Sequence, residues 1–202
     1  MAKIRDLVYV VLDLEATYHP LVGRHEIIEI GACKLKPATL EIDTTFDKLV
    51  RPTSLICGPI IQKTGITDET VSKAKLIENI WSEFRSFIGD SILIDHQQSM
   101  DMSILKITAE KLNLVPINNP VIDTLRLAKR SFPNEKSYGL PHLRKVIDVK
   151  EPEKHRALND AQDTALLFKK IVEILEKEYQ VTEYQELYDF CFGKNPMQAQ
   201  LL

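Results

Sequence analysis

The sequence of 202 residues predicts a single α/β domain in which helices cover both faces of a mixed five-stranded sheet. Three strand-like segments come first and lie close together in the chain, whereas two later ones alternate with helical patterns. Strands joined by short turns can pair antiparallel, and strands that need a helical crossover pair parallel, so the first three are expected to be antiparallel neighbours. A hydrophobic content of 44% is enough for a sizeable core.

Each strand candidate is a short apolar run bounded by turn-forming or charged residues. The first is continuous and rich in valine, as in strands buried on both faces, and Asp13 is expected to end it. Residues 36–39 are few enough to join the second and third strands as a hairpin. The five candidates are residues 7–12, 27–35, 41–50, 91–94 and 121–123.

Apolar residues at helical spacing predict the helices that cover the sheet. Thr67 begins a pattern typical of a helix start, and Gly193 and Pro196 are expected to end the last helix. The main helical stretches are residues 77–88, 102–112, 125–130, 158–175 and 184–191. Residues 1–178 are expected to form the main domain, with residues 179–202 as a C-terminal helix and tail.

Composition places the chain among compact proteins of the cytoplasm. No run approaches the roughly 18 apolar residues of a membrane helix, and the N-terminus has no signal-peptide pattern, so a cytoplasmic location is expected. Cys33, Cys57 and Cys191 are far apart and odd in number, which favours reduced, packed thiols. The net charge of −3 does not indicate a nucleic-acid-binding protein, but divalent ions bound to acidic residues would reverse the local field. Basic residues gather between positions 129 and 156, and solvated helix faces account for most of them.

Asp13 and Glu15 directly follow the first predicted strand. Residues two apart on a strand point to the same side, so one divalent ion can touch both carboxylates. Taken alone, such a pair is more often two exposed surface acids. Its place after a buried strand, where α/β sheets locate their sites, favours the functional interpretation.

Asp95, His96 and Asp101 lie between the fourth strand and the helix that follows it. Asp101 is just ahead of that helix, where aspartate is a good N-cap, and this structural role is the alternative to a functional one. Asp95 and His96 also follow the strand, so these residues by themselves do not decide which is a ligand.

His155 and Asp160 are five residues apart, which on a regular helix turns their side chains about 140° from each other. The two reach one cavity if Asp160 lies in the first turns of the long helix and His155 in the preceding loop. A histidine there suits a general base, because its unperturbed pKa of about 6.5 is near operating pH. The alternative is an ordinary exposed loop histidine.

In order along the chain, three segments resemble the motifs of the DEDDh exonuclease family. They are Asp-Leu-Glu-Ala-Thr from Asp13, His-x4-Asp ending at Asp101, and His-Arg-Ala-Leu-x-Asp-Ala from His155. Thr64-Gly-Ile-Thr-Asp also resembles the branch that contains the epsilon proofreading subunit of bacterial DNA polymerase III. The resemblance covers residues 7–175 and implies a ribonuclease H-like three-layer fold, with an exonuclease domain over residues 1–178.

The resemblance also implies the chemistry. By resemblance, the ligands of two divalent ions are Asp13, Glu15, Asp101 and Asp160, and the residue that activates the attacking water is His155. Four carboxylates without cysteine favour hard ions, so Mg²⁺ or Mn²⁺ is expected. The expected reaction is 3′-5′ hydrolysis of single-stranded nucleic acid ends, DNA favoured, to nucleoside 5′-monophosphates, in replication proofreading or repair.

Two alternatives stay open: an RNA-trimming 3′-5′ exoribonuclease, and a non-catalytic module that docks on a polymerase or sliding clamp. Gln97 and Met100 stand where the family usually has asparagine and an aromatic residue, which should alter the packing around Asp101 more than its metal chemistry. Tyr18 follows the first motif in place of glycine, and this motif also resembles the start of RNA-directed relatives, which leaves the choice between DNA and RNA open. The segment from Gln198 to Leu202 resembles the peptide that sliding clamps bind.

Overall fold

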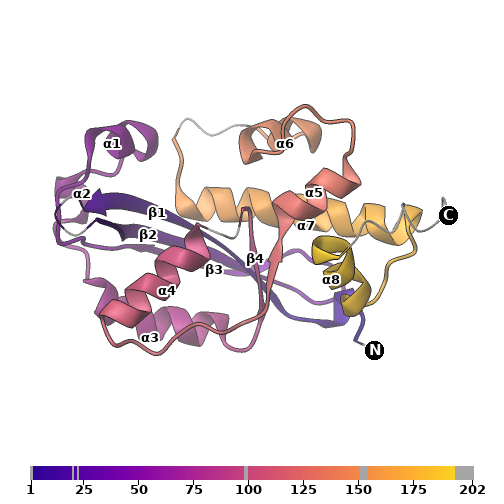
Figure 1. The fold of residues 1–202 in the computed structure, drawn as a ribbon, viewed down its shortest axis with the longest axis horizontal. Coiled ribbons are helices and arrows are strands. Elements are labelled where there is room, and N and C mark those ends of the chain that lie inside the picture. The colour runs from indigo at the N-terminus through magenta and orange to yellow at the C-terminus, as the bar shows by residue number, and fades with distance from the viewer. Residues whose placement is uncertain (1, 20, 22, 98–99, 151–153, 194–202) are drawn as a thin grey trace.

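The computed structural model describes residues 2–19, 21, 23–97, 100–150 and 154–193. Its centre is a five-stranded sheet with the order β3-β2-β1-β4-β5 (Figure 1). The strands are β1 (Tyr9–His19), β2 (Arg24–Leu35), β3 (Ile42–Leu49), β4 (Ile92–Asp95) and β5 (Val121–Asp123). β2 pairs antiparallel with β1 and β3, whereas β4 pairs parallel with β1 and β5. The predicted fold class and strand directions are confirmed.

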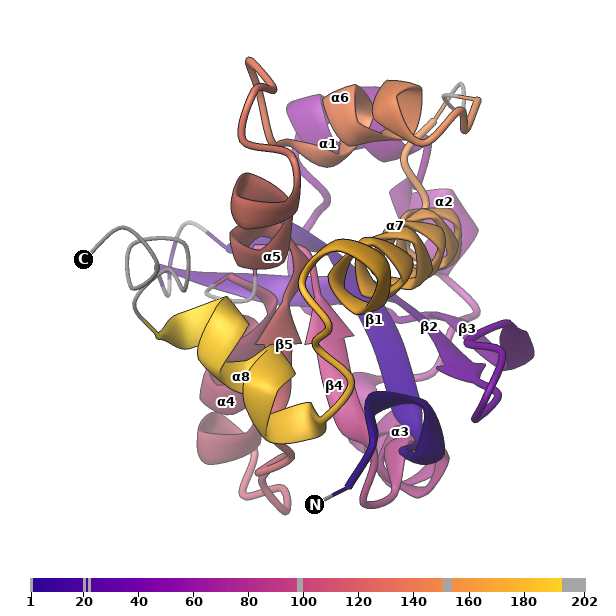
Figure 2. The ribbon, with the colours of Figure 1, turned by 90° about the vertical axis from the view of Figure 1, so that its right-hand side faces the viewer.

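Helices cover both faces of this sheet. They are α1 (Gly58–Thr64), α2 (Asp68–Val71), α3 (Ile77–Ile88), α4 (Asp101–Lys111), α5 (Thr124–Ser131), α6 (Leu140–Val146), α7 (Ala157–Glu178) and α8 (Tyr184–Phe192). α3 and α4 pack on one face and α5 to α8 on the other. Figure 2 views α7 nearly along its axis, over β1 and β2.

The alternation of side chains along β1 divides the core into two layers. Tyr9 and Val11 pack on the α7 side, where the Tyr9 and Phe168 rings have centroids 5.1 Å apart. Val10 lies on the opposite side, in the cluster that contains Phe84 of α3. Because residues two apart share a face, Asp13 continues the α7 side of the strand. The next polar positions of β1 are therefore directed toward α7.

β1 is longer than the sequence predicted. Asp13 does not end it, because β2 pairs with β1 as far as His19, with a bulge between Glu15 and Ala16. Backbone N–H and C=O groups pair between antiparallel strands whatever the side chains are. The polar residues after Asp13 can therefore continue the strand, which the apolar run alone does not indicate.

Gly31 of β2 lets α7 approach the sheet. It lies opposite Asp13 in the β1–β2 ladder. A Cβ atom at position 31 would lie 2.0 Å from the Leu158 backbone nitrogen and 2.1 Å from the Ala157 carbonyl carbon. Only glycine fits here without movement of the helix. This contact brings the first turn of α7 next to Asp13.

The Gly31→Ala substitution should therefore displace the start of α7. We expect a loss of about 1–3 kcal/mol in the free energy of unfolding, because the added methyl group meets backbone atoms that cannot rotate away. Urea denaturation measures this loss. Gly58→Ala is the matched control, since nothing lies within 4 Å of a Cβ built there. Equal stability of both variants would contradict the tight contact.

α8 is part of the packed core. Leu187, Phe190 and Cys191 are buried, and Gly193 follows the helix as predicted. Pro196 and the segment from Gln198 to Leu202 lie outside the described residues. All three cysteines are free thiols, as predicted. Among the helices of the described ranges, none is both long and apolar enough to cross a lipid bilayer.

Candidate active site

Asp13 and Glu15 project from the half of β1 that extends beyond the apolar run. The Glu15 side chain is only 4% exposed, which excludes the alternative of two exposed surface acids. Burial raises the pKa of Asp13 well above its ordinary value, and the nearby Asp101, Asp160 and Glu15 carboxylates raise it further. Burial also raises the pKa of Glu15. The four predicted carboxylates therefore act on one another across a single cluster.

Asp101 is the first residue of α4, and its side chain does not cap the helix. Its Oδ2 accepts a hydrogen bond from the Leu14 backbone N–H at 3.1 Å, a bond that joins α4 to β1 between Asp13 and Glu15. The N-cap position is Met100, which makes no side-chain cap. Burial raises the pKa of Asp101 to about 6. The functional interpretation fits this position better than the capping role.

Asp95 and His96 have other surroundings. The His96 ring lies 2.9 Å from both Thr124 Oγ1 and the Tyr138 carbonyl oxygen, so both ring nitrogens have partners in the fold. Asp95 is 1% exposed, and burial, followed by the neighbouring Asp101, raises its pKa well above the ordinary value. Among the described residues its Oδ2 atom has no hydrogen-bond partner. His96 is thus held by the fold, and Asp95 is a buried neighbour of Asp13 and Asp101.

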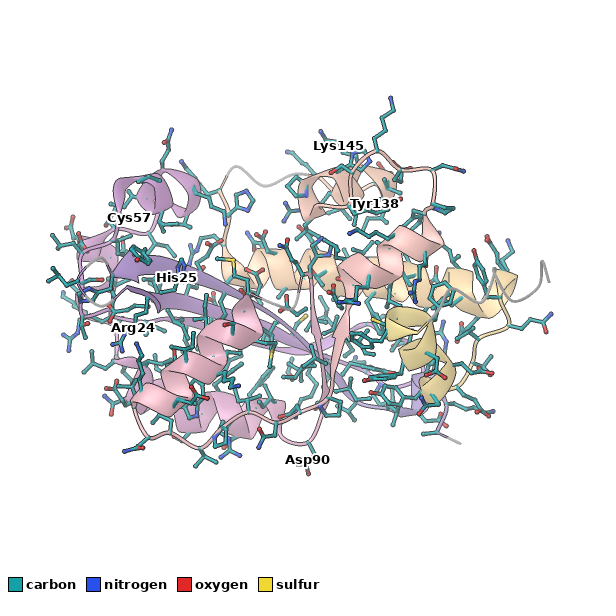
Figure 3. All side chains as sticks on the ribbon, viewed as in Figure 1. Arg24, His25, Cys57, Asp90, Tyr138 and Lys145 are labelled. Atoms are coloured by element: carbon teal, nitrogen blue, oxygen red, sulfur yellow. The ribbon has the colours of Figure 1, made fainter. Side chains whose placement is uncertain are left out.

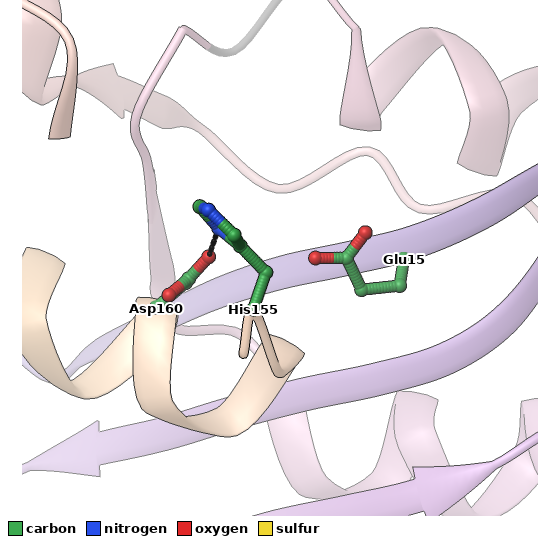
Figure 4. A group of neighbouring side chains, drawn as sticks. All are labelled: Glu15, His155 and Asp160. Carbon is green, nitrogen blue, oxygen red and sulfur yellow. Dashed lines mark hydrogen bonds and ion pairs between the residues drawn. The ribbon is translucent and has the colours of Figure 1, made fainter. Parts of the chain in front are cut away.

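His155 and Asp160 meet as predicted, with His155 in the loop and Asp160 in the first turn of α7. His155 Nδ1 lies 3.0 Å from Asp160 Oδ2 (Figure 4). Glu15 completes the group, because one ligand atom from each of the three residues lies within 4.8 Å of the others. The His155 side chain is 32% exposed, so solvent reaches the ring.

The loop before α7 is held at two positions of α1. The His155 backbone N–H donates to the Lys63 carbonyl oxygen at 3.2 Å, and Lys154 Nζ donates to the Gln62 carbonyl oxygen at 2.9 Å. These carbonyl groups are at the C-terminal end of α1, where no helical partner exists for them. The histidine is therefore positioned by backbone contacts.

Glu29 is a residue that sequence reasoning missed. It lies opposite Glu15 in the ladder and is fully buried. Its carboxylate accepts hydrogen bonds from the Ala157 backbone N–H and from Arg156 Nε, both at 2.8 Å. A carboxylate suits the first N–H groups of α7, which lack helical partners. Glu29 thus fixes the helix that carries Asp160.

Arg144 is the second residue of the site that the sequence did not indicate. In the sequence it is only one of several basic residues between positions 129 and 156. Its side chain is fully buried. It pairs with Asp160 Oδ1 and, at 2.6 Å, with Asp163 Oδ2. One side of the Asp160 carboxylate is therefore held by Arg144, while the other side faces His155. No local sequence pattern reports this pairing, because it joins α6 to α7.

Replacing Arg144 with methionine should destabilise the fold by about 3–5 kcal/mol, because two largely buried carboxylates lose their cation. Thermal or urea unfolding measures the loss. Lys145→Met is the matched control with the same change of charge, since Lys145 is exposed and points away from the domain in Figure 3. A loss no greater than that of the control would contradict the buried role of Arg144.

The donor set fits a hard divalent cation. Its oxygens come from carboxylates, and among the described residues no thiolate takes part. Burial raises the pKa of Asp13 and of Asp101, and the neighbouring carboxylates raise the pKa of Asp13 further. A bound Mg²⁺ or Mn²⁺ ion would relieve this repulsion.

Comparisons with known proteins identify the family of the chain. A family model described as Exonuclease matches residues 10–168, which include every predicted site residue. DNA polymerase III PolC-type of Bacillus cereus is 35% identical over 187 residues, covering 92% of this chain and 13% of that protein. The chain thus spans about an eighth of the length of this relative.

Solved structures share the fold. The nuclease domain of 3′hExo, a DEDDh family member, bound to rAMP, has a TM-score of 0.72 at 22% identity, covering 85% of this chain and 94% of that one. Exonuclease X in complex with 5′ overhanging duplex DNA has a TM-score of 0.66 at 23% identity, covering 89% and 99%. With the family model spanning most of the sequence, the chain belongs to the exonuclease family that this model describes, and it shares its fold with the DEDDh member.

Proposed function

We propose that the protein is a metal-dependent 3′-5′ exonuclease that removes nucleoside 5′-monophosphates from single-stranded 3′ ends. The observation that carries this proposal is the cluster itself. Asp101, Asp160 and Glu15 each raise the pKa of Asp13, and His155 contacts Asp160. A fold gains nothing from such a concentration of like charges, so the cluster favours a catalytic role over a docking module.

The four carboxylates would hold two Mg²⁺ or Mn²⁺ ions, which when bound stabilise the negative charge that develops on the scissile phosphate. His155 would take the proton of the attacking water at Nε2, because Nδ1 faces Asp160. Asp160 orients the ring through this contact. Glu15 would contact the terminal 3′ hydroxyl, as the family resemblance implies.

DNA is the favoured substrate. The matched PolC-type relatives are named as DNA polymerases, which supports DNA, and the whole polymerase context is itself a proposal because the chain spans so little of those proteins. A second candidate is RNA, which is supported by the similar fold of the 3′-exonuclease described with a histone mRNA stem-loop, with a TM-score of 0.73. The sliding-clamp role of the segment from Gln198 to Leu202 stays a prediction from the sequence.

Paired substrates separate the two candidates. Single-stranded DNA and RNA oligonucleotides of the same base sequence, each 5′-labelled, are incubated with the protein and Mg²⁺ or Mn²⁺ in one mixture. Faster shortening of the DNA supports the proposal, and faster shortening of the RNA supports the exoribonuclease. Intact oligonucleotides of both kinds would favour the docking module.

A further inference from the structure

In the described part of the chain, two cationic side chains contact the carboxylates of the site, and they differ in how firmly they are held. The guanidinium of Arg144 is fully buried between Asp160 and Asp163. Lys63 instead reaches in from α1 with a side chain that is 48% exposed, and its Nζ lies 3.2 and 3.4 Å from the two oxygens of Glu15. The first cation is a fixed part of the core, whereas the second can move into solvent.

The Lys63–Glu15 pair is suited to exchange. A lysine ammonium group is a compact charge on a flexible stem, and its pairing at a partly exposed position is worth little. Glu15 also belongs to the set of ligand atoms that includes His155 and Asp160. Carboxylate oxygens of this kind are preferred ligands of a hard divalent ion. The ammonium group and the ion therefore compete for one carboxylate.

The backbone of Lys63 holds the loop that carries His155, independently of the Lys63 side chain. Its carbonyl oxygen accepts the His155 N–H, and the adjoining Gln62 carbonyl accepts Lys154 Nζ. These contacts do not involve the Lys63 side chain. The ammonium group can leave Glu15 while the loop that carries His155 keeps its anchor, and a substitution of the Lys63 side chain should leave that anchor in place.

We propose that Lys63 is a positioning residue that neutralises and orients Glu15 until a divalent ion displaces its ammonium group. This inference rests on the metal site of the proposed function. Before metal arrives, the ammonium group compensates the charge of a carboxylate whose side chain is almost fully buried. When metal arrives, Glu15 is already held toward His155 and Asp160, and Lys63 moves outward. Lys63 therefore lowers the affinity for the ion.

Calorimetric titration of the metal-free protein with Mn²⁺ tests the exchange. The Lys63→Met variant should bind the ion about two- to fivefold more tightly than the wild type, because a competing ion pair of modest strength is gone. Lys145→Met is the matched control: it removes the same charge from an exposed position on α6, away from the loop that carries His155, and it should bind within twofold of the wild type.

If Lys63→Met binds Mn²⁺ no more tightly than Lys145→Met, while the wild type binds and Asp13→Asn does not, the exchange alone is overturned. Absence of binding by the wild type would remove the metal site and the exchange together. Thermal unfolding gives a second readout. Lys63→Met should melt below the wild type in EDTA and at the same temperature in saturating Mg²⁺. A gap that persists in Mg²⁺ would also overturn the exchange.

Discussion

The Asp13→Asn variant should lose exonuclease activity by on the order of 10³-fold or more, because a central ligand of the proposed metal site disappears. In metal-free protein the same substitution should raise stability. Burial and the neighbouring carboxylates hold the pKa of Asp13 well above its ordinary value, so the ionised group costs folding free energy at neutral pH. The neutral amide removes that cost, which we expect to be about 1–2 kcal/mol.

The gain in stability from Asp13→Asn should depend on pH. A carboxyl group whose pKa is raised in the folded state stabilises the fold while it is protonated, and that contribution is lost as pH rises through the folded pKa. The advantage of Asp13→Asn in EDTA should therefore grow from acidic to neutral pH. Urea denaturation across this range measures it. Asp43→Asn, an exposed acid on β3, is the control and should change neither stability nor activity. A destabilised, active Asp13→Asn protein would contradict the proposed role.

Replacing His155 with alanine should slow hydrolysis by about 10²- to 10⁴-fold, the usual contribution of a positioned general base. The four carboxylates stay in place, so the protein should still bind Mn²⁺. The loss should shrink at high pH, where hydroxide is abundant and the base is less needed. Single-turnover rates across a pH series, with metal affinity measured in parallel, separate a missing base from a missing metal site.

His142→Ala is the matched control for His155. His142 is also half-exposed, and its Nε2 lies 2.7 Å from a carboxylate oxygen of Glu135. It differs in lying outside the group formed by Glu15, His155 and Asp160. We expect this control to keep the wild-type rate. Full activity of His155→Ala at neutral pH would remove the histidine from the mechanism.

Local sequence patterns were sufficient to predict most helices and strands and the segments that form the candidate site. Helix α3 has the predicted bounds of residues 77–88, and β5 those of residues 121–123, because apolar spacing and turn residues act over short distances. The helical geometry also predicted that His155 lies in a loop and Asp160 in a helix. Each of these features depends on neighbours in the sequence.

Long-range pairings account for what the sequence did not report. The extension of β1 depends on β2, and the tight approach at Gly31 depends on α7. Glu29 and Arg144 are buried charges whose partners lie on α7. A carboxylate or guanidinium in a sequence is most often a surface group, so nothing local distinguishes these two residues. Only the folded chain identifies them as supports of the site.

The most direct test of the central claim follows a 3′-labelled and a 5′-labelled single-stranded DNA oligonucleotide with Mn²⁺ or EDTA. Wild-type protein with Mn²⁺ should release labelled mononucleotide from the 3′-labelled strand at the earliest times and shorten the 5′-labelled strand stepwise. EDTA or Asp13→Asn should stop both. Release of mononucleotide from the 5′ label first, cleavage within the strand, or equal cleavage by Asp13→Asn would contradict a 3′-5′ exonuclease built on this cluster.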